Sequence, residues 1–349
     1  MAYSSITKPS LHFNTVTYTG NATARSITGV GFQPDWVWIK NRSSGSLWHQ
    51  LQDAVRGAAK NLYSNNTNAE AATGTASITS FDSDGFTIGT GNGANGNGNN
   101  IVSWNWKAAN SSGSSNSDGS ITSTVSANTT AGFSIITYTG TGSTTTVGHG
   151  LGVKPNVVIY KERNSANSWR LMTDVSGTLK RLYLNVTDAE ASITDSSTAP
   201  TSTVLNIGTG SEVNRDSNAT YVAYCFAQKK GFSKFGLYTG QDGVFIYTGF
   251  KPAFILGKNI SNAGYDWWIF DNKRDTFNDG ANNLLLRANS ADAEATFTYA
   301  KVDFLSNGFK IYGTDNTVNG NGATMFYMAF AEEPFVANVG SNGIPATAR

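Results

Sequence analysis

The stretch Asn65-Asn66-Thr67-Asn68-Ala69-Glu70-Ala71 recurs twice along this chain, as Asn185-Val186-Thr187-Asp188-Ala189-Glu190-Ala191 and as Asn289-Ser290-Ala291-Asp292-Ala293-Glu294-Ala295. The shared pattern, Asn-x-x-(Asn/Asp)-Ala-Glu-Ala, is called the Asn/Glu motif below. Its recurrence predicts three copies of one structural unit of about 100 residues, a common size for a domain. A residue that folds the unit should occur in every copy, whereas a residue that performs a single reaction has no reason to.

The segments that precede the motif have the periodicity of strands. Each copy opens with an aromatic and β-branched run, at residues 13–20, 133–140 and 236–249, and period-2 alternation in the first run predicts a half-buried strand. A proline, an apolar run and a lysine follow, at residues 34–40, 155–161 and 252–258. Proline suits the start of a strand, and the continuous apolar run predicts a central strand that is buried on both faces.

A third shared segment ends at an aspartate, which we align as Asp53, Asp174 and Asp271. The residue four positions earlier is His49, Arg170 or Trp267, and this variation indicates a peripheral position. Asn and Asp accept backbone hydrogen bonds in turns, so a structural role is the simpler interpretation of the motif. The residues that we expect to define the repeat structurally are Asn65, Glu70, Asn185, Glu190, Asn289, Glu294, Asp53, Asp174 and Asp271.

Each copy ends with a further hairpin, and its arms are joined by Gly- and Asn-rich loops such as residues 91–98, which we expect to form an exposed turn. Many short strands with almost no helical periodicity predict an all-β protein of three tandem β-sandwich repeats, of jelly-roll or lectin-like type. The expected divisions are an N-terminal anchoring segment, repeat 1, a Ser/Gly/Asn/Thr-rich linker, repeat 2, repeat 3 and a C-terminal tail, at residues 1–12, 13–108, 109–132, 133–230, 231–335 and 336–349.

The composition disfavours several classes of function. With 25 basic and 24 acidic side chains the net charge is +1, so no electrostatic footprint for nucleic acid is visible. A single cysteine, Cys225, rules out an intramolecular disulfide framework, and no Cys/His cluster has zinc spacing. No apolar run is long enough to cross a bilayer, so we expect no membrane insertion. We expect no cofactor.

Several stretches carry a resemblance to a known family, namely residues 29–35, 81–86, 231–240, 247–254, 303–310 and 327–332. They are similar to a repeat family of tailed, especially marine, phages whose members are described as virion structural or tail-fibre-like proteins. The resemblance implies a non-enzymatic protein on the particle exterior, synthesised in the host cytoplasm, for host attachment or display. It also implies contacts with other virion proteins, for which Met1 to Leu11 would serve as an anchor, and it leaves open a homotrimer and a capsid decoration role.

Two further functions remain as alternatives, a glycan-binding lectin and a polysaccharide hydrolase. Glu70 and Asp53 could be imagined as paired glycosidase carboxylates, but a triplicated pair favours a scaffold role. None of His12, His49 and His149 has a partner at triad spacing, and the stretch 82–85 lacks most of a calcium loop. We therefore expect no catalytic residue and no metal site. For a glycan contact we select Trp48, Asn95 and Asn97.

Overall fold

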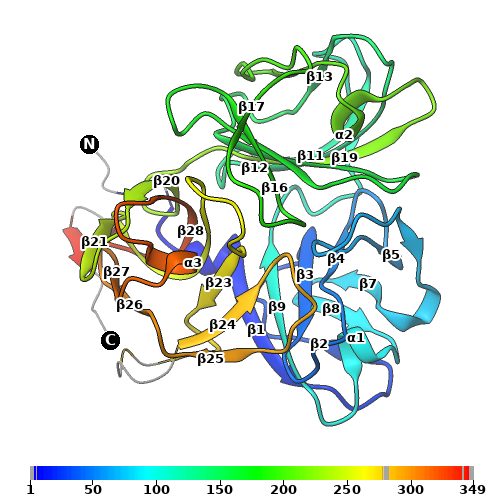
Figure 1. Cartoon of the computed structure of the whole chain (residues 1–349). Coiled ribbons are helices and arrows are strands. Elements are labelled where there is room, and N and C mark those ends of the chain that lie inside the picture. The colour runs from blue at the N-terminus through cyan, green and yellow to red at the C-terminus, as the bar shows by residue number, and fades with distance from the viewer. Residues whose placement is uncertain (1–3, 5, 277, 279–282, 340–341, 346–349) are drawn as a thin grey trace.

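Antiparallel β-strands make up most of the regular structure in the computed structural model, which describes residues 4, 6–276, 278, 283–339 and 342–345 (Figure 1). The predicted all-β class is confirmed. The strands form three large sheets, each accompanied by a smaller one.

The three large sheets contain one recurring order of four strands. In spatial order the first sheet consists of β1 (Phe13–Thr19), β9 (Asn100–Trp106), β3 (Trp36–Asn41) and β4 (Gln50–Asp53). The second consists of β10 (Ser114–Asn116), β11 (Ser123–Asn128), β12 (Phe133–Thr139), β19 (Thr220–Phe226), β14 (Val157–Glu162), β15 (Arg170–Thr173), β16 (Lys180–Tyr183) and β17 (Ala191–Ser192). The third consists of β20 (Ser233–Thr239), β28 (Thr324–Pro334), β22 (Phe250–Asn259), β23 (Trp268–Asp271), β24 (Asn283–Arg287) and β25 (Ala295–Phe297). The order β1-β9-β3-β4 thus matches β12-β19-β14-β15 and β20-β28-β22-β23.

The small sheets lie against the outer faces of the large ones. They consist of β2 (Arg25–Ile27), β8 (Gly85–Ile88) and β7 (Ile78–Asp82), of β13 (Thr145–Gly148) and β18 (Val204–Ile207), and of β21 (Val244–Tyr247), β27 (Gly308–Tyr312) and β26 (Lys301–Leu305). In the first pair of sheets, Val37 and Ile39 of β3 form one apolar cluster with Phe86 and Ile88 of β8. Two shorter pairings complete the named strands, β5 (Lys60–Asn61) with β6 (Ala71–Ala72) and β29 (Val336–Val339) with β30 (Asn342–Pro345).

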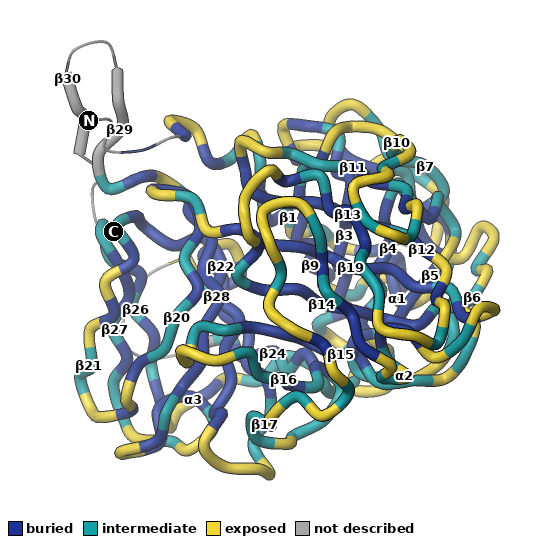
Figure 2. The backbone as a smooth tube through the Cα atoms, turned by 90° about the horizontal axis from the view of Figure 1, so that it is seen from above, coloured by how far each residue is buried: buried dark blue, intermediate teal, exposed yellow. Residues whose placement is uncertain are grey.

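The inner faces of the large sheets meet in one aromatic core. The rings of Trp36 in β3 and Tyr224 in β19 stack with centroids 4.4 Å apart, which joins the first and second sheets. Phe13 of β1 lies 5.4 Å from Phe330 of β28, and Phe226 of β19 lies 5.8 Å from the same ring. Buried apolar surface contributes about 25 cal/mol per Å², so this shared core holds the three sheets together (Figure 2).

The proline-led strands are central and buried on both faces, as predicted. Every residue of β3, β14 and β22 is buried, and each of these strands has a partner on either side. Proline precedes β3 and β14, but Pro252 lies inside β22 at an irregularity in its pairing with β28. A strand can accept proline at such a point because the ladder is already interrupted there.

The short helices are single turns that precede the last strand of each large sheet. They are α1 (Asn92–Asn95), α2 (Ser211–Asn214) and α3 (Asn316–Asn319), and two 3-10 turns, η1 (Pro9–Leu11) and η2 (Gly74–Ala76), occur elsewhere. The expectation of a wholly exposed turn at residues 91–98 is wrong, because Gly93, Ala94 and Asn95 are buried.

The expected linker at residues 109–132 is not structureless. It contains β10 and β11, which extend the second large sheet beside β12. The N-terminal segment also packs on the body, because Ile6 is 4% exposed and Ser4 donates a hydrogen bond to the carbonyl of Lys230. The side chains of the C-terminal tail lie outside the described residues.

Candidate functional site

The asparagine that begins each Asn/Glu motif anchors a neighbouring strand through its backbone. Asn65 Oδ1 accepts a hydrogen bond from the backbone N of His49 at 3.0 Å. Asn185 accepts one from Trp169 N, and Asn289 accepts one from Trp267 N, each at 2.8 Å. The three asparagines thus make one and the same contact, which holds the motif beside the strand that starts one residue later.

The backbone of each motif glutamate joins its own sheet to another. Glu70 N donates to the carbonyl of Arg163 at 2.7 Å, and Glu190 N donates to Ile260 at 3.1 Å. Glu294 N donates to Arg42 at 2.9 Å. These contacts run from the first sheet to the second, from the second to the third, and from the third back to the first. The motif therefore closes the three sheets into a ring.

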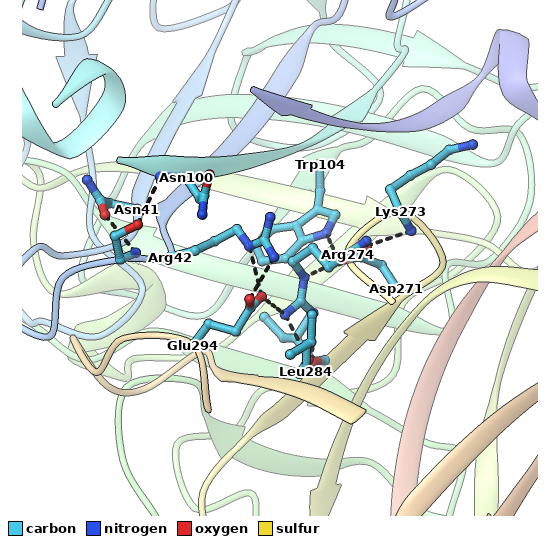
Figure 3. A network of polar contacts seen from close by, with 11 residues as sticks. Asn41, Arg42, Asn100, Trp104, Asp271, Lys273, Arg274, Leu284 and Glu294 are labelled. Atoms are coloured by element: carbon cyan, nitrogen blue, oxygen red, sulfur yellow. Dashed lines mark hydrogen bonds and ion pairs between the residues drawn. The ribbon is translucent and has the colours of Figure 1, made fainter. Parts of the chain in front are cut away.

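At two of these three junctions the glutamate side chain is held between arginines. Glu70 accepts two hydrogen bonds from Arg163, from Nε and Nη2, both at 3.0 Å, and a third from Arg56 Nη1 at 3.0 Å. Glu294 is bound in the same way by Arg42 and Arg274 (Figure 3). Two-point pairing of this kind fixes geometry as well as charge.

A buried aspartate completes each of these networks. Arg56 Nε lies 2.5 Å from Asp53 Oδ2, and Arg274 Nε lies 2.6 Å from Asp271 Oδ2, with all four side chains fully buried. Asp53 and Asp271 each accept a further bond from a different sheet, from the Tyr224 hydroxyl at 2.7 Å and the Trp104 indole at 2.9 Å. We call these networks the first clasp (Asp53, Arg56, Glu70, Arg163, Tyr224) and the second clasp (Asp271, Arg274, Glu294, Arg42, Trp104).

The junction between the second and third sheets has no clasp. The positions that match the clasp residues carry Thr173, Ser176, Ile260 and Met328, and Glu190 is left with a hydrogen bond from the Ser176 hydroxyl at 3.3 Å. Burying one of these charged side chains without its ionic partners would cost free energy. The replacement of all four clasp partners of the glutamate together avoids that cost.

The pKa of the two glutamates differs accordingly. Burial by itself would raise the pKa of Glu70, but the hydrogen bonds from Arg163 and the charge of Arg56 outweigh burial and lower it. For Glu190, burial prevails over the Ser176 hydrogen bond and the Lys180 charge, and the pKa is raised.

The alignment of Asp174 with Asp53 needs a correction. Asp53 pairs across the sheet with Trp36, the second residue after its proline, and Thr173 pairs with Val157 in the same way. Thr173 is therefore the true counterpart, and Asp174 instead forms an ion pair with Lys154 at the surface. The shift by one residue escaped the sequence alignment because both positions follow the same apolar strand.

His49 is a structural residue, and its counterparts are Trp169 and Trp267. Trp38 Nε1 donates to His49 Nδ1 at 2.8 Å, so the ring carries its proton on Nε2, 3.0 Å from the carbonyl of Arg287. Trp169 and Trp267 donate their indole N–H to the carbonyls of Tyr63 and Tyr183, which lie two residues before the motif of the preceding sheet, as Arg287 does. The position is buried, so the predicted peripheral placement is wrong. Burial, together with the Lys40 charge, lowers the pKa of His49.

The lysines that end the central strands also link the sheets. Lys40 Nζ donates at 2.8 Å to the carbonyls of Leu47 and Ala291, and Lys258 Nζ reaches the carbonyl of Thr187 at 3.1 Å. Burial lowers the pKa of Lys40, Lys161 and Lys258 to about 8. Two of these ammonium groups therefore hold the Asn/Glu motif of another sheet.

The residues selected for a glycan contact lie in different environments. Trp48 is 39% exposed and packs edge-on against Tyr63. Asn97 is exposed, but Asn95 has no accessible surface, and its amide donates to the carbonyls of Thr23 and Gly89. Asn95 is thus a framework residue, as are its counterparts in α2 and α3.

The arginines of the clasps escaped sequence reasoning, although a signal was present. Asp53 and Arg56 are three residues apart, as are Asp271 and Arg274. At the matching positions the second copy has Thr173 and Ser176. Neither the pairing partner nor its sheet could be inferred from that spacing.

Comparison with protein families gives one match. The family described as "Domain of unknown function (DUF7483)" matches residues 8–334, which span all three large sheets and both clasps. The chain belongs to this family. Comparisons with curated proteins and with solved structures returned no match. In the part of the chain that the structure describes, this DUF7483 member has no helix long and apolar enough to cross a membrane, and no cluster of three or more potential metal ligands.

Proposed function

We propose that this protein is a non-enzymatic structural component of a tailed-phage particle, in which three β-sandwich repeats close into a ring and face the particle exterior for attachment or display. The proposal names a tail-fibre or appendage protein first and a capsid decoration protein second. Its phage assignment rests on the sequence resemblance over residues 231–254 and the related stretches.

The repeat organisation is supported by matched contacts. The same four-strand order occurs in each large sheet, and the same asparagine contact occurs in each Asn/Glu motif. Because the ring closes from the third sheet to the first, the three repeats form one rigid body and not a series of independently moving domains. Rigidity of this kind suits a protein that must hold its shape on a particle.

The observation that carries the non-enzymatic part is the use made of the carboxylates. Glu70 and Asp53, the pair that a glycosidase would need, are both bound by the buried guanidinium of Arg56. A glycosidase carboxylate must reach substrate and, as an acid, keep a proton near neutral pH. The lowered pKa of Glu70 and its arginine partners work against both requirements.

The decisive test is the location of the chain after infection. Antibody raised against the purified protein would be used on gradient-purified particles of the phage that encodes it, by immunoblot and by gold labelling in electron microscopy. Gold on tails supports the appendage assignment, and gold on heads supports capsid decoration. Absence of the chain from particles, while it is abundant in the infected cells, would refute the proposal.

The enzymatic alternative has its own test. The purified protein would be incubated with host surface polysaccharide and assayed for new reducing ends. We expect none. Cleavage by the wild type that is abolished in Glu70→Gln, with folding retained by circular dichroism, would instead establish a hydrolase.

A further inference from the structure

A cavity of about 520 Å³ lies between the N-terminal segment and the third large sheet. Residues 7–10 and the start of β1 line one side, and the end of β28 and the turn after β23 line the other. Its volume falls within the range of about 300–1,000 Å³ that small-molecule sites occupy. We propose that this cavity binds a saccharide, with the side-chain amide of Asn272 as its polar anchor.

Asn272 provides the first reason. The residue is only 4% exposed and lines the cavity, yet neither Oδ1 nor Nδ2 has a hydrogen-bond partner among the residues that the structure describes. A buried amide without partners is costly, and native proteins contain few. A ligand that both donates and accepts a hydrogen bond would remove that cost.

The second reason is that the other two large sheets fill the corresponding place. Asp35 precedes β3 and accepts backbone N–H bonds from Ala108 and Asn110, which leave the sheet after β9. Asn156 precedes β14 and accepts one from Gln228. In both cases a polar side chain accepts hydrogen bonds from the segment that leaves the sheet, and that segment covers the end of the sheet.

The third sheet has no such closure. Its matching residue is Ala253, which lines the cavity, and β28 continues to Pro334 instead of leaving the sheet. Asn272 N donates to the carbonyl of Ala253, and Ala54 N donates in the same way to the carbonyl of Asp35. Ala54 of the first sheet is therefore the residue that matches Asn272. In the second sheet the matching residue is Asp174, which forms an ion pair with Lys154. Among the described residues, the unpaired amide at this position therefore occurs in the third sheet.

The chemistry of the lining favours a neutral, hydroxyl-rich ligand. Lys8 and Lys273 are balanced by Glu332 and Glu333, so the lining offers no net attraction to an anion. An amide presents one donor group and one acceptor side by side, which matches two adjacent hydroxyls of a sugar ring.

The apolar part of the lining suits the other face of the same ligand. Pro9 and Pro334 line the cavity and offer apolar atoms to the C–H face of a pyranose. The site would give the attachment role proposed above a molecular basis, and it rests on that role only for its biological meaning, since binding can be measured on the isolated chain.

The test uses the full chain and the variant Asn272→Ala. Wild type and variant would be applied to a printed array of bacterial surface polysaccharides and oligosaccharides, and each saccharide bound would then be titrated by isothermal calorimetry. We expect saturable binding that Asn272→Ala weakens by about tenfold or more, equivalent to one lost bidentate contact. The melting temperature should stay equal or rise, because the variant removes an unpaired buried amide.

Two further variants make the result specific. Ala253→Asn places in the cavity the amide that Asn156 provides in the second sheet, and it should also weaken binding. Val153→Ala, at an exposed side chain before β14 in the second repeat, should leave it unchanged. The inference is overturned if no saccharide binds saturably, or if Asn272→Ala binds as tightly as wild type. The gold labelling of particles tests the proposed location of the protein, and its outcome does not depend on whether the cavity binds a saccharide.

Discussion

Glu70 and Arg163 are 93 positions apart in the chain and form a two-point ion pair in which both N–O distances are 3.0 Å. The pair joins the first large sheet to the second, and Glu294 with Arg42 joins the third sheet to the first. No such pair exists at the described junction of the second and third sheets, where Ile260 replaces the arginine. One molecule thus contains two junctions held by an ion pair and one without it, which serves as a natural control.

Removing the charge of Glu70 should therefore destabilise the protein far more than the same change at Glu190. In Glu70→Gln, Arg56 and Arg163 lose the Glu70 carboxylate that they share. A broken buried ion pair costs on the order of 3 kcal/mol. Glu190→Gln removes a carboxylate whose pKa is already raised by burial, so the free energy of unfolding should change little or increase. Urea unfolding of both variants is the measurement. Equal losses in the two variants would contradict the assignment of the clasp.

The Trp38 and His49 pair should behave as one packing unit. The other sheets hold Ile159 with Trp169 and Leu256 with Trp267 at these positions. His49→Trp alone overfills the site and removes the hydrogen-bond acceptor of the Trp38 indole. Trp38→Leu alone leaves a cavity. The double variant restores the combination of the third sheet, so a double-mutant cycle should give a coupling energy of about 2 kcal/mol. Additive losses would refute this reading.

The indole of Trp104 should contribute more than ring packing. Its N–H donates to the buried carboxylate of Asp271, whereas the indole N–H of Trp106, also buried, has no partner in the described part of the chain. Both can be changed to phenylalanine with a similar loss of volume. Trp104→Phe should cost about 2 kcal/mol more than Trp106→Phe, the value of a hydrogen bond to a charged group. Thermal unfolding of the two variants makes the comparison, and equal costs would show that the bond contributes nothing.

Stability should rise from pH 8 to about 9, below the range in which tyrosines ionise in the unfolded chain. The pKa of Lys40, Lys161 and Lys258 is lowered by burial to about 8, against an ordinary value of 10.5. In that window the unfolded chain keeps protons that the folded protein has released, so the free energy of unfolding increases with pH, by at most about 1.4 kcal/mol per pH unit for each lysine.

Urea unfolding at several pH values measures this slope. Lys258→Met should reduce it, whereas Lys154→Met, at a largely exposed side chain, should leave it unchanged. A stability that falls steadily from pH 8 to about pH 9 in the wild type would contradict the prediction.

Local pattern made much of the strand framework predictable. The apolar runs after Pro34 and Pro155 marked central strands correctly, because a strand buried on both faces needs apolar residues at successive positions. Pattern failed where two adjacent residues were equally plausible, as at Thr173 and Asp174, since a shift by one residue reverses the face of the sheet. It failed again at Asn95, where a Gly- and Asn-rich loop resembles a surface turn but folds inward to bond backbone carbonyls.

The sequence by itself determined the all-β class and the threefold recurrence of the Asn/Glu motif, because both depend on residue types at short spacing. Only the tertiary structure decided that the motif links different sheets, that two of the junctions contain an arginine–glutamate ion pair, and that Ala253 leaves a hollow beside Asn272. Those properties depend on which residues meet across 70 to 250 positions of chain. Short-range periodicity carries no record of such contacts, since they arise only when the aromatic faces of the three sheets pack together.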